Sequence, residues 1–132
     1  SLWVLMDWEN MRPVKVPEEI YSAYTLEDKL DMNYSSRKIS IPNGAIGVAK
    51  EPMNIGEHHL DANGHVNNGQ YVKIAMSYIP QNREYTHLRV EYRAQAHLGD
   101  LIYPMVYESD GAVNITLNNE EGTPYACLEL KY

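Results

Sequence analysis

The chain has 132 residues, a formal net charge of -7 and 44% apolar residues. This length fits one compact domain with its own core and is too short for two domains of ordinary size. The 11 lysines and arginines are scattered and no apolar run approaches the ~20 residues that cross a bilayer, which argues against both a nucleic-acid surface and a membrane span.

The first part of the chain carries two short extended segments and one helix signal. Trp3–Met6 is apolar and predicts a strand, and residues 11–16 predict an edge segment, because Pro13 lacks the N–H that a central strand needs. A proline followed by two glutamates predicts a short helix over residues 17–30. The turn-like composition of residues 31–37 then predicts a linker.

Beyond a boundary near Lys38, the pattern is that of a sheet with one helix. Asn43-Gly44 predicts a turn before a strand at Ala45–Asn54. A helix is predicted at Asn67–Ile79, where apolar residues recur with helical spacing and Pro80 ends the run.

Four strands are predicted after this helix. Residues 86–95 alternate between apolar and polar side chains, which indicates a strand with one buried face. Turn signals around Gly111 and Gly122 separate three further strands, at residues 101–108, 112–118 and 125–132. A lone helix must bury its apolar stripe on such a sheet. The predicted fold class is therefore α+β, with an antiparallel sheet wrapped around one central helix.

The single cysteine, Cys127, lies in the last predicted strand. It cannot form an internal disulfide, and a small buried side chain is ordinary at such a position. We therefore expect a soluble protein of the reducing cytoplasm.

Small polar residues crowd into the approach to the predicted helix. Asp61, Asn63 and His65 fall on alternating positions, so in an extended segment they share one side and point into the same cavity. A turn with Gly64 in a left-handed conformation is the alternative interpretation. It does not explain the alternation, and we therefore favour a functional site.

The start of the helix offers hydrogen-bond donors to such a site. The backbone amides of Val66, Asn67 and Asn68 lie at the positive end of the helix dipole, where they can stabilise an oxyanion without a metal. Either Asn67 or Asn68 can also cap the helix, and a cap explains one or two of the asparagines.

The run LDANGHVNNGQYV (Leu60–Val72) resembles the D-x-N-x-H-V-N-N-x-x-Y motif of the acyl-acyl carrier protein (acyl-ACP) thioesterases, whose subunits contain two hotdog domains in tandem. VEYRAQAHLGD (Val90–Asp100) is similar to the strand that faces the central helix of that fold, and WVLMDWENMRPVKVP (Trp3–Pro17) to the end of the first hotdog domain. The resemblance covers nearly the whole chain but only the second half of the family's usual length. It implies a C-terminal hotdog domain at residues 39–132, preceded at residues 1–38 by the tail of another hotdog domain plus a linker.

The resemblance also implies a catalytic set. In the family this set is the Asp, Asn and His of the motif plus a Glu on the following strand. The motif positions are occupied here by Asp61, Asn63 and His65, and Gln95 stands where the Glu is expected. A neutral amide can hold a water molecule but cannot take its proton. Either Asp61 or His65 then serves as the base, or activity is weakened or lost.

The function implied is hydrolysis of acyl-ACP to release a free fatty acid, as in fatty acid biosynthesis. The alternative is a catalytically weakened hotdog domain that acts as an acyl-thioester-binding or structural module. The expected partners are ACP carrying a fatty acyl chain and a second hotdog domain from the same chain. ACP is acidic in the families that use it, and this chain is acidic too, so a local basic patch must attract it. The candidates are Arg37, Lys38, Lys50 and Lys73.

No cofactor and no metal are expected. His58 and His59 precede the motif, but adjacent histidines on an extended segment point apart, and no second ligand cluster follows. His87 and His97 are predicted to be surface residues.

Overall fold

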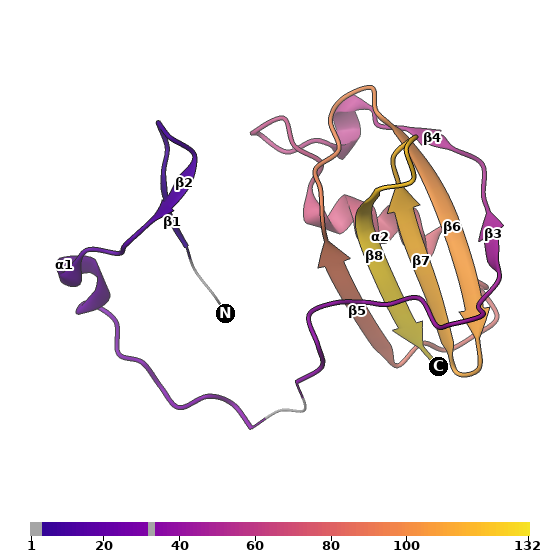
Figure 1. Cartoon of the computed structure of the whole chain (residues 1–132), viewed down its shortest axis with the longest axis horizontal. Helices are drawn as coiled ribbons and strands as arrows, with labels where there is room; N and C mark the ends of the chain where they lie inside the picture. The colour runs from indigo at the N-terminus through magenta and orange to yellow at the C-terminus, as the bar shows by residue number, and fades with distance from the viewer. Residues whose placement is uncertain (1–3, 32–33) are drawn as a thin grey trace. The chain divides into compact units, whose positions relative to one another are not determined.

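The computed structural model describes residues 4–31 and 34–132 and divides the chain into two units, Ser1–Tyr34 and Ser35–Tyr132. The first unit contains an antiparallel pair, β1 (Leu5–Asp7) and β2 (Arg12–Val14), and one helical turn, α1 (Glu18–Tyr21) (Figure 1). The start of the strand predicted at Trp3–Met6 lies outside the described residues.

The helix predicted over residues 17–30 is much shorter than expected. Pro17 precedes α1 and two glutamates lie in its first turn, as the sequence indicates, but the helix ends after 4 residues. None of its residues is buried. A helix without a packed face gains too little from its few hydrogen bonds to extend further, so the predicted length was wrong.

The second unit is built on a six-stranded antiparallel sheet. The strand order is β3-β6-β7-β8-β5, and β4 also pairs with β6. The strands are β3 (Gly47–Ala49), β4 (Met53–Asn54), β5 (His87–Tyr92), β6 (Leu101–Ser109), β7 (Ala112–Asn118) and β8 (Pro124–Lys131). The strand predicted at Ala45–Asn54 is split into β3 and β4, because Pro52 between them has no N–H to donate to β6.

Helix α2 (Asn68–Met76) packs on one face of this sheet (Figure 1). The Asn67 side chain caps it by accepting a hydrogen bond from the Gly69 N–H at 2.8 Å, and the helix ends before Pro80. Its buried residues Tyr71, Ile74 and Ala75 share one core with Val113, Ile115 and Leu117 of β7 and with Ala126, Leu128 and Leu130 of β8. The predicted hotdog arrangement of one helix against an antiparallel sheet is confirmed.

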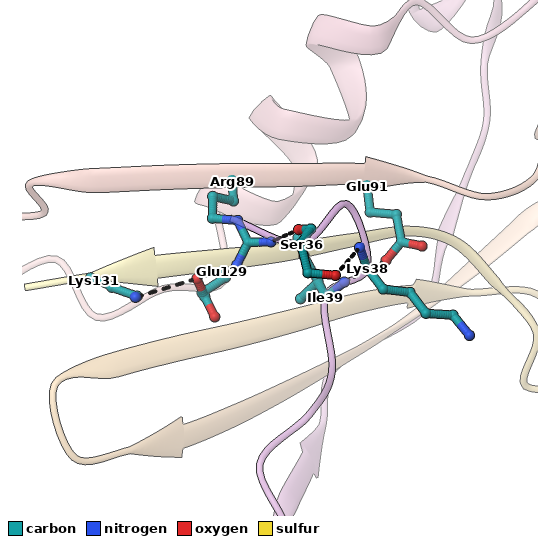
Figure 2. A network of polar contacts seen from close by, with 7 residues as sticks. All are labelled: Ser36, Lys38, Ile39, Arg89, Glu91, Glu129 and Lys131. Atoms are coloured by element: carbon teal, nitrogen blue, oxygen red, sulfur yellow. Dashed lines mark hydrogen bonds and ion pairs between the residues drawn. The ribbon is translucent and has the colours of Figure 1, made fainter. Parts of the chain in front are cut away.

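Residues 36–41, here called the strap, cross the opposite face of the sheet (Figures 1 and 2). Ile39 anchors the strap and is only 3% exposed. Its N–H donates to Glu91 Oε2 at 2.8 Å, and its carbonyl accepts from Arg93 Nη2 at 2.9 Å. The Arg89 guanidinium donates to the Ser36 carbonyl. The polar side chains of β5 therefore hold the strap.

Two carboxylates, Glu91 and Glu129, form ion pairs with the basic side chains beneath the strap. Glu91 lies 2.9 Å from Arg93, and this guanidinium, followed by the hydrogen bond from the Ile39 N–H, holds the pKa of Glu91 below its usual value. Glu129 on β8 lies 3.0 Å from Arg89 and 3.8 Å from Lys131 (Figure 2). Alternation along β5 thus places these charged groups on the face opposite α2.

Strand β5 differs from the prediction in both length and burial. Leu88 is 46% and Tyr92 42% exposed, because within the described residues β5 pairs only with β8 and lies at the edge of the sheet. After Tyr92, the N–H groups of Arg93 and Ala94 both donate to the Tyr125 carbonyl, at 2.8 and 3.2 Å. This shared acceptor ends the regular ladder, and the chain leaves the sheet before Gln95.

Candidate active site

The motif forms a closed turn in front of α2. The Asp61 N–H donates to the His65 carbonyl at 2.8 Å, and Leu60 and Val66 lie opposite each other as an isolated bridge. Gly64 has φ +74°, the left-handed conformation that glycine adopts most easily. The extended geometry predicted for this segment was therefore wrong.

The Asp61 side chain explains why the segment turns. Its Oδ1 accepts hydrogen bonds from the N–H groups of Asn63 at 2.8 Å and His65 at 3.2 Å. An aspartate that satisfies two amides of its own loop stabilises a turn over an extended segment. Asp61, Asn63 and His65 are all exposed in this turn.

A buried histidine supports the motif from the preceding turn, Glu57–His59. His59 Nδ1 accepts the Gly56 N–H at 3.0 Å, so the proton of the neutral ring lies on Nε2. The His59 carbonyl accepts the Asn67 N–H at 3.1 Å. The rings of His58 and His59 lie 3.9 Å apart, so the prediction that they point apart was wrong. Burial, followed by the neighbouring His58, lowers the pKa of His59.

We expect the unfolding free energy to fall as the pH drops below about 6.5, and His59→Asn to reduce this fall. The folded state favours neutral His59, so the unfolded chain takes up the proton first, near pH ~6.5, and stability is lost as the pH falls through the lower folded pKa. Asparagine keeps an oxygen acceptor for the Gly56 N–H but does not titrate.

Urea unfolding at several pH values measures this effect, with exposed His87→Asn as the matched control. Parallel pH curves for the wild type and His59→Asn would contradict the assigned role of His59.

Two of the three predicted amide donors remain available. The Asn67 N–H is already donated to the His59 carbonyl. Among the described residues, the N–H groups of Val66 and Asn68 have no acceptor. Both lie at the start of α2, where the helix dipole is positive.

A cleft joins the start of α2 to the segment that follows β5. It is lined by Val66, Asn68, Tyr71, Tyr92, Arg93, Ala94 and Gln95. The structure therefore brings Gln95 to the same cleft as the two residues that carry the available amides, although about 30 residues separate them in sequence. Asp61, Asn63 and His65 lie in the motif turn and do not line this cleft.

Two tyrosine hydroxyls fasten the sides of the cleft to each other. Tyr71 accepts the Ala96 N–H at 2.9 Å, and Tyr92 donates to the Asn68 carbonyl at 3.1 Å. Burial raises the pKa of both phenols, which keeps them in the protonated form. A hydroxyl within the apolar stripe of α2 is the signal that could have identified Tyr71.

His65 has a neighbour that sequence reasoning did not find. Its ring meets the His97 ring in a T-shaped contact, with centroids 6.5 Å apart and an interplanar angle of 86°. His97 is exposed, as predicted for a surface residue.

The four candidate cations for carrier-protein binding do not form one patch. Arg37 and Lys38 belong to the strap, on the face of the sheet opposite α2. Lys73 is exposed on α2, and Lys50 lies between β3 and β4. The two faces must therefore be tested separately.

In residues 4–31 and 34–132, no three His, Cys, Asp or Glu side chains gather as metal ligands would. The helices within these ranges are all too short or too polar to span a bilayer.

The fold and motif were compared with known proteins. The chain resembles an acyl-ACP thioesterase from Bacteroides thetaiotaomicron, with a TM-score of 0.73 at 16% identity over 96% of this chain and 52% of that one. The 12:0-ACP thioesterase from Umbellularia californica gives a TM-score of 0.70 at 18% identity, again over 96% and 52%. A Staphylococcus aureus protein solved in complex with CoA gives a TM-score of 0.57 at 17% identity, over 67% of this chain and 79% of that one.

The chain thus spans about half the length of the two acyl-ACP thioesterases that it resembles. No curated protein sequence matches it. The family model for the acyl-ACP thioesterase C-terminal domain matches residues 50–131, which include the motif, α2 and every strand from β4 to β8. The chain therefore belongs to the acyl-ACP thioesterase family, through the C-terminal hotdog domain of that family.

Proposed function

We propose that this chain is the catalytic half of an enzyme that hydrolyses acyl-ACP to a free fatty acid. The observation that carries the proposal is the cleft that Gln95 shares with the available amides of Val66 and Asn68. Thioester hydrolysis needs donors for the carbonyl oxygen as it becomes negative, and a group that holds the attacking water. Residues that carry both kinds of group line this cleft.

Each residue of the predicted set has a proposed role. The amides of Val66 and Asn68 donate to the oxyanion, and Gln95 holds the water. Of the two predicted bases we favour His65, because Asp61 already accepts two N–H groups and thereby holds the motif turn. Asn63, exposed in the same turn, is proposed to position the water or the thioester. The Asn67 amide, committed to the His59 carbonyl, supports the helix start.

The second candidate function is an acyl-thioester-binding module without catalysis. The observation that favours it is Gln95 itself, since an amide cannot take a proton where the family has a carboxylate. The two functions differ in one measurable property, turnover of a bound thioester.

The test compares wild type with Gln95→Glu in the natural full-length protein. Release of free thiol from acyl-ACP and acyl-CoA is measured beside binding of a non-hydrolysable acyl analogue. We expect hydrolysis by the wild type. If the wild type is inert and Gln95→Glu gains nothing while the analogue still binds, the enzyme proposal is lost and the module remains.

Recognition of ACP is expected to depend on one face of the domain. The cleft lies at the start of α2, so reversal of Lys73 and Lys50 to Glu should raise the Michaelis constant for acyl-ACP several-fold and spare acyl-CoA. Reversal of Arg37 and Lys38 on the opposite face is the matched comparison. An equal response of the two substrates would show that these cations do not bind the carrier protein.

We also propose that the first unit is the tail of a preceding hotdog domain, and that a linker follows it up to a boundary near Lys38, within the strap. An isolated two-stranded pair is marginal in water. The exposed fractions are 57% for Val4, 39% for Leu5 and 82% for Trp8. A second hotdog domain from the same chain would cover such apolar surface.

The 132-residue chain alone is therefore expected to self-associate, whereas the protein with both hotdog domains is expected to be well behaved. Sedimentation velocity of the two forms measures this. A stable monomer of the 132-residue chain would contradict both the boundary and the missing neighbour.

A further inference from the structure

The segment that carries Gln95 also brings a second imidazole to the motif. Gln95 and His97 are exposed on either side of Ala96, which is completely buried. Gln95 lines the cleft at the start of α2, and His97 contacts the His65 ring.

His97 is held in place although its side chain is 65% exposed. Its N–H donates to Asp100 Oδ2 at 2.8 Å, and its Nδ1 lies 3.8 Å from the same oxygen. The Tyr125 hydroxyl donates to that carboxylate at 3.2 Å, and the Gly99 N–H donates to the Ile55 carbonyl at 2.9 Å. The turn that carries His97 is thus fastened to the core.

We propose that His97 is a positioning residue for His65, and that the two imidazoles act as a pair in thioester hydrolysis. This inference rests on the proposed function. In the reaction, the water oxygen bonds to the carbonyl carbon, His65 takes the water proton, the C–S bond breaks, and the departing thiolate receives that proton. His97 fixes the plane of the His65 ring at this step, where Gln95 offers no negative charge.

The charged neighbours of the pair are few. Asp100 faces His97 and is itself bonded by the Tyr125 hydroxyl. Asp61 lies on the other side, where its carboxylate accepts the His65 backbone N–H. These contacts place one carboxylate next to each of the two residues.

The experiment uses two variants of His97 in the full-length protein, with acyl-CoA as substrate. His97→Ala should lower kcat by about 10- to 100-fold with little change in KM, the loss that a misplaced catalytic group causes. His97→Phe keeps an aromatic ring against His65, so it should restore most of the kcat that His97→Ala loses. His87→Ala, exposed on β5, should match the wild type in both measurements.

A double-variant cycle separates positioning from an independent role. If His97 acts through His65, adding His97→Ala to His65→Ala should cost almost nothing further. Losses that multiply in the double variant would overturn the inference, as would a wild-type kcat in His97→Ala or a failure of His97→Phe to restore kcat. In either case a wild type that hydrolyses thioesters leaves the proposed function standing. A wild type that binds thioesters but cleaves none overturns both.

Discussion

Ala75→Asp is expected to unfold the hotdog domain. Ala75 lies on the inner face of α2 with no exposed surface, in one core with β7 and β8. An aspartate at this position would be a buried charge without a partner, which costs about 4 kcal/mol or more. Domains of this size are stable by only about 5–15 kcal/mol. Urea unfolding followed by circular dichroism should show a much lower midpoint, or no folded baseline.

Met76→Asp provides the matched control. It places the same charge on the neighbouring residue of α2, where the side chain is 37% exposed. Only the unfavourable position near the helix C-terminus remains, with a cost of about 0.3–1 kcal/mol. If Ala75→Asp unfolds at the same urea concentration as Met76→Asp, α2 does not form the core of this domain.

His65→Ala is expected to lower turnover by about 10²- to 10⁴-fold, the range found for loss of an acid–base group. His65 is exposed in the motif turn, so the unfolding free energy should change by less than about 0.5 kcal/mol. Asn63→Ala should likewise reduce turnover without loss of stability. Steady-state hydrolysis of acyl-ACP and thermal unfolding of the same samples measure the two effects.

The control for His65→Ala is His87→Ala, an exposed histidine on β5. It should retain the wild-type rate. A His65→Ala protein that folds normally and turns over substrate at the wild-type rate would remove His65 from the mechanism.

Sequence predicted best those elements whose signals are local. Helix α2 is an example, because its apolar stripe, its Asn67 cap and its end before Pro80 all favour a helix over other structures. The turns at Gly111 and Gly122 both have positive φ, and they separate the last three strands where predicted. These signals each depend on a few adjacent residues.

Predictions failed where contacts distant in sequence decide the structure. Alternation indicated a buried face for residues 86–95, but a strand at the edge of a sheet leaves Leu88 exposed. The contact between His65 and His97 follows from where β5 ends and how the chain turns after it. No pattern in the sequence around His65 or around His97 predicts that the two rings meet.

The conformation of the motif turn was predicted wrongly for a different reason. Alternation of Asp61, Asn63 and His65 indicated an extended segment, whereas hydrogen bonds from the Asp61 side chain to two nearby amides close a turn. Both interpretations were available from the same residues, and local side-chain hydrogen bonding decided between them.

The most direct test of thioester hydrolysis at this cleft is a single-turnover reaction of the natural full-length protein with acyl-ACP in heavy-oxygen water. We expect free thiol on the carrier protein and a fatty acid that contains one heavy oxygen atom, since water is the nucleophile. An acyl-ACP that binds but stays intact, with no labelled fatty acid, would contradict hydrolysis by this protein.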